Sequence, residues 1–211
     1  MDIKLACLKI TVTNDTINVL QPFLPPKRNQ STGTGFFFDS TPFLDSWKIT
    51  ENVREEFKNK ALILTCAHVV ENAIKVQISY TNESKEKYDA DILCVCPDFD
   101  LAVLSTTPPK NAKFESLKCA TSFLSKLFKS GNKCESYGYP LSTSYLQVTS
   151  GSLGFESLTE DKNFVNLYGL QHTCAINPGS SGGPLISFNH GGEPRVIGIN
   201  FSGFDASAAT G

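Results

Sequence analysis

One serine in this chain is surrounded by glycines in a way that suits nucleophilic catalysis. Residues 176–185 read INPGSSGGPL, so Ser181 lies close to Gly179, Gly182 and Gly183. Glycine costs backbone entropy, so several glycines around one hydroxyl indicate a backbone held in an unusual geometry. Acyl transfer needs such a geometry, because a Ser oxygen attacks a carbonyl while nearby backbone N–H groups hold the oxyanion. The segment therefore predicts a nucleophilic serine.

Candidate partners for this serine lie far away in the sequence. A serine nucleophile needs a base to take its proton and a third group to orient that base. The chain offers three histidines, and His68 stands out over His172 and His190 because it ends an apolar run. Asp100 precedes the apolar run Leu-Ala-Val-Leu, where a buried orienting carboxylate is expected. Asp98 is a rival acid, but the apolar strand directly follows Asp100.

Each of these features has an ordinary explanation when taken alone. A His after an apolar run is commonly a strand-end residue, an Asp before a strand is commonly a turn residue, and Gly-Ser-Ser-Gly-Gly is commonly a flexible loop. Their joint occurrence in the order His68, Asp100, Ser181 favours a catalytic triad in the chymotrypsin-type order. The nucleophile elbow of α/β-hydrolases is disfavoured, because it requires the order Ser, acid, His and a helix where Gly-Gly-Pro stands here.

The elements that would position these residues are mostly strands. Residues 6–12 alternate between apolar and polar types, which is typical of a strand. A loop is expected over residues 21–33, a short surface helix over 52–60, and a short helix or irregular connection over 116–130. Many short strands with little helix predict an all-β barrel or sandwich. Further strands are expected at residues 35–38, 61–66, 74–80, 88–96, 101–105, 134–138, 146–155, 164–173, 184–188 and 196–201.

A set of motifs makes the chain similar to the HtrA/Deg branch of the trypsin-like serine proteases. They are Thr-Cys-Ala-His-Val-Val at 65–70, Asp-Leu-Ala-Val-Leu at 100–104, Asn-Pro-Gly-Ser-Ser-Gly-Gly-Pro-Leu at 177–185 and Val-Ile-Gly-Ile-Asn at 196–200. Shorter matches, such as Gly-Thr-Gly-Phe at 33–36, follow the family's order. The resemblance implies two six-stranded antiparallel β-barrels with the active site between them. Viral chymotrypsin-like cysteine proteases share this fold, and a serine nucleophile disfavours them.

The resemblance also implies how the chain is divided. Residues 1–107 would form an N-terminal barrel carrying His68 and Asp100, and residues 108–211 a C-terminal barrel carrying Ser181. The family pattern has one more strand near the point where this chain stops. A fragment, or a second barrel without its last strand, is therefore expected, and the sequence contains no PDZ-like domain.

Catalytic roles follow from the same resemblance. Ser181 would be the nucleophile, His68 the general base and Asp100 the group that orients the imidazole. The backbone N–H groups of Gly179 and Ser181 would form the oxyanion hole. Secreted trypsin-like enzymes have an aspartate before the nucleophile, which pairs with a newly cleaved N-terminus. Here that position is Ser180, so activation by zymogen cleavage is not expected.

Substrate-binding residues are also implied. Ala175 stands where trypsin has a carboxylate, so Lys or Arg would be poorly accommodated. We expect a preference for small or medium aliphatic side chains before the cut. The substrate backbone is expected to pair as an added strand with Asn200, Phe201 and Ser202.

Composition argues against several other functions. The net charge of −2 and the pI of about 5.9 give no electrostatic reason to bind nucleic acid or a membrane. No apolar run approaches the roughly 20 residues of a spanning helix. An odd count of seven cysteines and no visible secretory signal predict free thiols and an intracellular, cytoplasmic location. No metal or other cofactor is expected, since Cys94 and Cys96 on one strand face are best explained by packing.

These features lead to two functional hypotheses. The first is an ATP-independent serine endopeptidase that acts on polypeptide substrates in protein quality control, with a trimer as the frequent family assembly. The second is a catalytically silent trypsin-like module that binds proteins. The complete set of His68, Asp100 and Ser181 favours the enzyme.

Overall fold

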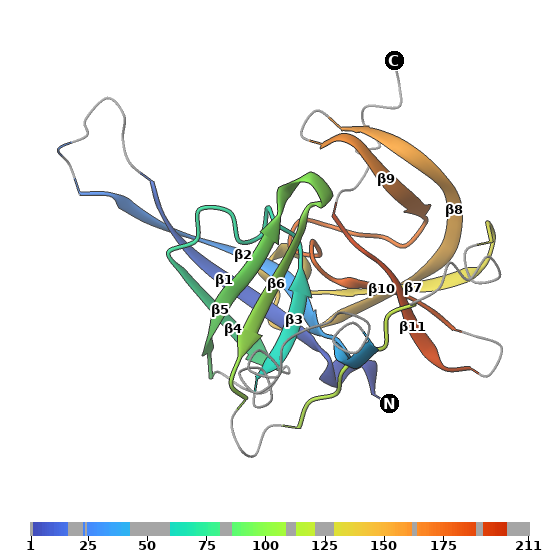
Figure 1. The fold of residues 1–211 in the computed structure, drawn as a ribbon, viewed down its shortest axis with the longest axis horizontal. Helices are drawn as coiled ribbons and strands as arrows, with labels where there is room; N and C mark the ends of the chain where they lie inside the picture. Colours follow the sequence, from blue (N-terminus) through green and yellow to red (C-terminus); the bar gives the residue numbers. More distant parts are fainter. Residues whose placement is uncertain are drawn as a thin grey trace.

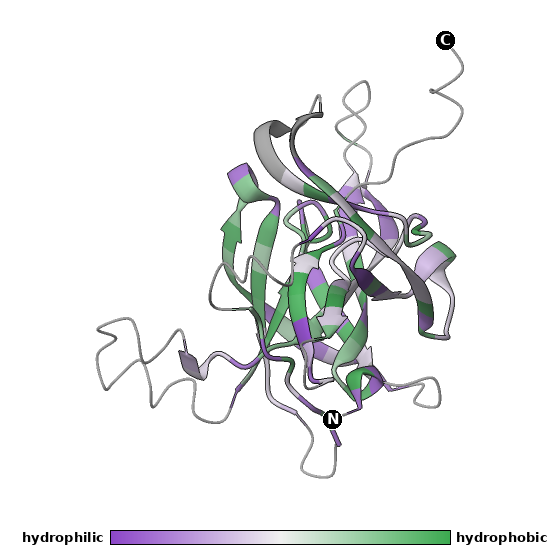
Figure 2. Cartoon of the chain, turned by 90° about the vertical axis from the view of Figure 1, so that its right-hand side faces the viewer, coloured by the Kyte–Doolittle hydropathy of each residue, from purple (hydrophilic) through white to green (hydrophobic). Residues whose placement is uncertain are grey.

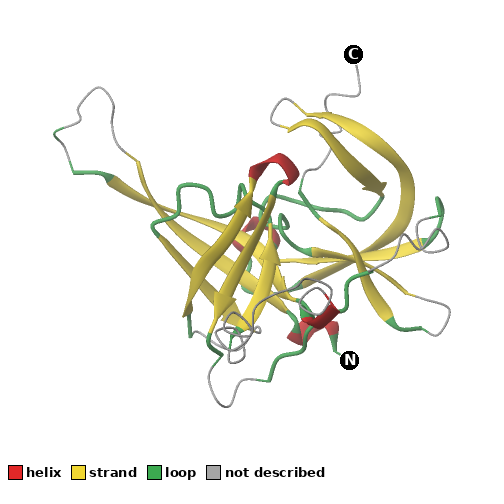
Figure 3. Ribbon diagram, viewed as in Figure 1, coloured by secondary structure: helices red, strands yellow, loops and turns green. Residues whose placement is uncertain are grey.

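The computed structural model of the chain is built almost entirely of β-strands (Figure 3). It describes residues 2–16, 23, 25–42, 60–80, 86–108, 113–120, 129–161, 164–188 and 192–201. Short 3-10 helices in these residues are η1 (Ile3–Leu5), η2 (Pro97–Phe99) and η3 (Pro140–Ser142). The strands are β1 (Cys7–Thr16), β2 (Lys27–Phe37), β3 (Ala61–Thr65), β4 (Lys75–Tyr80), β5 (Tyr88–Cys96), β6 (Leu101–Thr106), β7 (Lys133–Gly138), β8 (Gln147–Asp161), β9 (Phe164–His172), β10 (Pro184–Phe188) and β11 (Pro194–Ile199).

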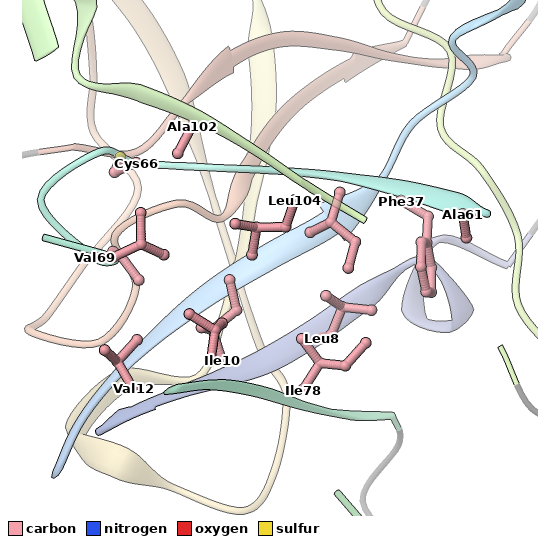
Figure 4. Close-up of a cluster of buried hydrophobic side chains, with 13 residues drawn as sticks. Leu8, Ile10, Val12, Phe37, Ala61, Cys66, Val69, Ile78, Ala102 and Leu104 are labelled. Carbon is pink, nitrogen blue, oxygen red and sulfur yellow. The ribbon is translucent and has the colours of Figure 1, made fainter. Parts of the chain in front are cut away.

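The first six strands close into an antiparallel barrel in the order β1-β2-β3-β6-β5-β4 (Figure 1). The alternation seen in the sequence explains its interior, because side chains at every second position of a strand point to one face. Leu8, Ile10 and Val12 of β1 are buried there against residues of the other strands (Figure 4). The rest of this cluster is Phe37, Ala61, Ile63, Cys66, Val69, Val70, Val76, Ile78, Ala102 and Leu104.

The second half of the chain forms a five-stranded sheet in the order β11-β10-β7-β8-β9. Its own small core contains Cys134, Leu153, Cys174 and Leu185. The expected all-β architecture of two antiparallel barrels is thus confirmed, with the second barrel present as an open sheet in the described residues. The division at residue 107 stays a prediction.

A shared apolar cluster holds the barrel against the sheet. Phe36 of β2 packs there with Tyr137 of β7 and Ile186 of β10, and all three side chains are almost completely buried. Apolar residues, green in Figure 2, are concentrated on the packed strands. No helix in the described residues is long and apolar enough to cross a membrane.

The structure corrects one expectation about local structure. Residues 27–33 were expected to lie in a loop, but they belong to β2 and pair with β1 from Ile10↔Gly33 to Thr16↔Lys27. This polar stretch lacks the apolar alternation of a buried strand, so its strand conformation comes from the partner strand. Leu117 and Cys119 make isolated bridges to Phe38 and Val196, which agrees with an irregular connection. The expected helix at 52–60 lies outside the described residues, except for residue 60.

Candidate active site

Strand pairing brings His68 and Asp100 together. β3 ends at Thr65, which pairs with Ala102 near the start of β6. His68 lies in the turn that follows β3, and Asp100 lies just before β6. The end of one antiparallel strand meets the beginning of its neighbour, so residues distant in sequence meet at one edge of the barrel.

Both carboxylate oxygens of Asp100 bind His68. The His68 backbone N–H donates to Oδ1 at 2.9 Å, and the ring Nδ1 lies 2.7 Å from Oδ2. Asp100 is 1% exposed, so these bonds stabilise a charge that would otherwise be costly to bury. An ionised carboxylate only accepts hydrogen bonds, so Nδ1 carries the proton and Nε2 is left as the basic nitrogen.

The rival residues from the sequence are placed differently. Asp98 lies in η2 and is exposed. His172 ends β9, and its buried Nδ1 has no hydrogen-bond partner among the described residues. Burial lowers the pKa of His172, although Asn200 opposes this shift. His190 lies outside the described residues.

The loop carrying Ser181 is attached to the first barrel. The carbonyl of Ser181 accepts a hydrogen bond from the Thr34 N–H of β2 at 2.9 Å. A Cβ atom on the neighbouring Gly182 would lie 3.2 Å from the backbone N of Cys66, close to His68 in sequence. Ser181 therefore lies beside the segment that carries His68. Across the described ranges, no hydrogen bond joins the Ser181 hydroxyl to His68; catalytic hydrogen bonds are often long before substrate binds.

The backbone of this loop leaves two N–H groups free. The N–H of Ser180 donates to Asn177 O at 2.9 Å and that of Gly183 donates to Ser180 O at 3.0 Å. Gly182 N–H donates to a carbonyl of the segment after β11. In the described part of the chain, the N–H groups of Gly179 and Ser181 have no partner. These are the two groups expected to form the oxyanion hole.

The loop requires glycine beside this pair of N–H groups. Gly179 has φ = +98°, a left-handed conformation that residues with side chains rarely adopt. A Cβ atom there would lie 2.7 Å from Tyr139 O.

Comparison with known proteins agrees with this arrangement. The sequence profile of the trypsin-like peptidase domain matches residues 33–199. The chain belongs to the trypsin-like peptidase family. It is 37% identical over 147 residues to serine protease Do-like HtrB of Bacillus subtilis, covering 67% of this chain and 30% of that protein. It is 35% identical over 147 residues to periplasmic serine endoprotease DegP of Escherichia coli, covering 67% of this chain and 27% of DegP.

A solved structure has the same fold. The structure of the HtrA-type protease AlgW with decapeptide superposes with a TM-score of 0.65 at 21% identity, covering 96% of this chain and 57% of that one. This likeness shows the fold. The chain spans about a third or less of the length of the curated relatives HtrB and DegP.

In this member of the trypsin-like peptidase family, the expected substrate-binding residues are placed as follows. Ala175 is exposed and borders a small hollow. Asn200 is buried, with its side-chain Nδ2 donating to Ser136 Oγ at 2.8 Å. Phe201 is half-buried and packs against the barrel core, and Ser202 lies outside the described residues. Among the residues that the structure describes, no charged side chain borders the hollow, whose lining is Ser136, Gly138, Pro140, Gln147, Thr149, Ala175 and Ser180.

Cys66 is a residue of the site that sequence reasoning missed. Its Sγ donates to the Asn200 carbonyl at 3.2 Å. The ligand atoms of Cys66, His68 and Asp100 lie within 4.8 Å of one another, but His68 Nδ1 and Asp100 already bind each other. Burial, and secondarily the Asp100 charge, raise the pKa of the Cys66 thiol. A thiol that keeps its proton is a poor nucleophile, so Cys66 does not compete with Ser181.

Alkylation tests whether Cys66 is unreactive while Ser181 acts as the nucleophile. We expect iodoacetamide to modify the exposed Cys94 and Cys96 and to spare the buried Cys66, because the reaction needs an accessible thiolate. Peptidase activity should survive the treatment, as measured by peptide hydrolysis and mass spectrometry of the modified sites. Loss of activity in step with modification of Cys66 would contradict the assignment.

The close packing around Gly182 can be tested by adding a methyl group there. A Cβ atom there would lie 2.1 Å from Thr34 O and 2.2 Å from Thr65 Oγ1, and φ is +86°. We expect Gly182→Ala to destabilise the fold by about 2–4 kcal/mol, because the backbone of Thr34 cannot shift away from the added methyl group without disturbing the barrel. Urea unfolding measures the loss. Gly131→Ala is a suitable comparison, since φ is +86° there and nothing lies within 4 Å of the added Cβ. A loss no larger than for Gly131→Ala would contradict the steric argument.

Proposed function

We propose that this chain is a serine endopeptidase that cleaves peptide bonds with Ser181, His68 and Asp100. The observation that carries the proposal is the buried Asp100 carboxylate, with both oxygens bound to His68 and the Ser181 loop beside them. A serine hydroxyl, an imidazole that takes its proton and a carboxylate that orients the imidazole are the groups that acyl transfer needs. The relatives named serine protease and serine endoprotease support the same activity.

The proposed reaction proceeds in two halves. Ser181 Oγ attacks the carbonyl carbon of the scissile bond while His68 Nε2 takes its proton, and Asp100 stabilises the resulting imidazolium. The free N–H groups of Gly179 and Ser181 stabilise the oxyanion; the loss of one such donor costs roughly 3–4 kcal/mol in the transition state. His68 then protonates the leaving amine. Water attacks the acyl-enzyme in the same way and releases Ser181.

The substrate proposed is a polypeptide, cleaved without ATP. The described lining of the hollow beside Ala175 carries no charge, so a Lys or Arg side chain would find no partner among these residues. We propose small or medium aliphatic side chains before the cut, with the substrate backbone added beside residues 200–202. In the described residues β11 lies at the edge of its sheet, where Cys119 bridges its outer side only at Val196, so the part toward Asn200 can accept an added strand. Protein quality control, as a trimer in the cytoplasm, is the proposed setting.

A fluorophosphonate probe tests the proposed activity. The probe should modify one serine in the folded protein, and peptide mapping should locate the adduct on Ser181. Ser181→Ala should not react, while Ser180→Ala serves as the matched control because it removes the neighbouring hydroxyl. A folded full-length protein that neither reacts with the probe nor cleaves peptides would instead support the protein-binding module.

Substrate preference needs a separate measurement. Peptides that differ only in the residue before the cut should be cleaved fastest with Val, Ile, Leu or Ala at that position. Faster cleavage after Lys or Arg would contradict the proposed pocket.

A further inference from the structure

We propose that Thr34 is a positioning residue whose hydroxyl holds Gly179 in the conformation that forms the oxyanion hole. Thr34 lies in β2 of the first barrel, whereas Gly179 lies in the loop before β10 of the second sheet. The proposal rests on the proposed peptidase function, because it concerns how that site is kept ready for reaction.

Thr34 makes four hydrogen bonds, and three of them connect the two halves of the molecule. Its Oγ1 donates to Gly179 O at 2.7 Å and accepts from Tyr139 N at 3.0 Å. Its backbone N–H donates to Ser181 O at 2.9 Å, and its carbonyl accepts from Thr65 Oγ1 at 2.7 Å. Thr34 is fully buried, so no solvent replaces these partners.

Hydrogen bonds hold the peptide planes on both sides of Gly179, one of them from Leu141 and the other from Thr34. Pro178 O accepts from Leu141 N at 2.6 Å. Because the peptide is planar and trans, the Gly179 N–H must point away from Leu141. On the other side, Thr34 binds Gly179 O while the opposite Ser180 N–H donates to the loop carbonyl of Asn177. With both planes held, Gly179 stays at φ = +98° with its N–H free.

The hydroxyl of Thr34 is the group that this arrangement needs. Without it, the buried Tyr139 N and the half-buried Gly179 O would lose these partners, and an unsatisfied polar group away from solvent is costly. The loop can avoid that cost by moving away from Thr34 together with the segment of Tyr139, which would release Pro178 O from Leu141 N and free the peptide that carries the Gly179 N–H to rotate. The methyl group of Thr34 has a different role, since its Cγ2 lies next to Gly183.

A pair of substitutions separates these two parts of the side chain. Thr34→Val keeps the shape and removes the hydroxyl, whereas Thr34→Ser keeps the hydroxyl and removes the methyl group. We expect Thr34→Val to lower kcat about 10- to 100-fold, somewhat less than the direct loss of an oxyanion donor, with KM changed less than about threefold. Thr34→Ser should stay within about threefold of the wild type in kcat.

Binding of a peptide aldehyde gives a readout that lost stability alone would not change. The aldehyde forms a hemiacetal whose oxygen occupies the oxyanion hole, so its affinity for Thr34→Val should fall by about the same factor as kcat. The affinity for a product peptide, which makes no such oxyanion, should stay the same. Thr34→Ala, which removes the hydroxyl and leaves space, repeats both measurements should the valine protein not fold.

A distant threonine controls for the loss of a buried hydroxyl. Thr106 is 3% exposed at the far end of β6, and its Oγ1 donates to Asp89 O at 3.0 Å. Thr106→Val should lower the melting temperature without lowering kcat. An unchanged kcat in Thr34→Val, or an equal loss in Thr34→Ser, would overturn the positioning role while leaving the peptidase intact. A wild-type protein without any peptidase activity would instead overturn the proposed function itself.

Discussion

Ser181→Ala is expected to lower kcat for peptide hydrolysis about 10⁵- to 10⁶-fold, with the fold unchanged. Removing Oγ leaves no group to form the acyl-enzyme, and only binding and oxyanion stabilisation remain to accelerate the reaction. Ser181 is half-buried and the structure shows no hydrogen bond of its hydroxyl to the described residues, so stability should change little. Steady-state hydrolysis of a chromogenic peptide and urea unfolding measure the two effects.

The neighbouring serine is the matched control for this experiment. Ser180 is 5% exposed, and its Oγ accepts only a long hydrogen bond of 3.4 Å from Asn177 N. Ser180→Ala should therefore keep kcat within a few-fold of the wild type. Equal losses in the two variants would show that the whole loop, rather than one hydroxyl, had been disturbed. A fully active Ser181→Ala protein would rule out Ser181 as the nucleophile.

Asp100→Asn should have the second-largest effect, lowering kcat about 10⁴-fold at neutral pH. Asp100 accepts from the backbone N–H of His68 through one oxygen and lies 2.7 Å from its Nδ1 through the other. The asparagine amide has one acceptor oxygen for these two donors. If the amide oxygen keeps its hydrogen bond with the backbone N–H, the amide NH₂ group faces Nδ1. Nδ1 must then accept a hydrogen bond, so the imidazole takes the tautomer with its proton on Nε2. His68 would no longer accept the serine proton.

Asp98→Asn controls for the loss of a charge next to the site. Asp98 is exposed in η2, only a short distance from Asp100 in the sequence. We expect its substitution to leave kcat within about twofold of the wild type. Determination of kcat for both variants over a range of pH compares the two carboxylates. A larger loss in Asp98→Asn would identify the other acid as the one that orients His68.

Strand positions were largely readable from the sequence. β1, β3, β4 and β7 lie close to their expected residues, because one buried face imposes a period of two on apolar side chains. The polar residues 27–33 carry no such pattern and were wrongly expected to form a loop. Their strand conformation depends on hydrogen bonds to β1, which are non-local information.

The candidate site, too, was only partly predictable from the sequence. His68, Asp100 and Ser181 could be chosen as candidates because acyl transfer needs particular residue types in particular local surroundings. The role of Cys66 was not, because its contact with the Asn200 carbonyl exists only after β3 and the segment beyond β11 have packed. Likewise, Ala175 could be placed at a pocket by resemblance, whereas the lining of the hollow comes from β7, β8 and the segments that follow β7 and β9.

By itself, the sequence of this protein determined an all-β architecture and the order of its reactive groups. Both depend on side-chain type and spacing along the chain, which no folding is needed to read. Only the tertiary structure decided that both carboxylate oxygens of Asp100 bind His68, and that Thr34 holds the carbonyl of Gly179. These contacts join residues far apart in sequence, so their distances and directions are set by how the barrel and the sheet pack together.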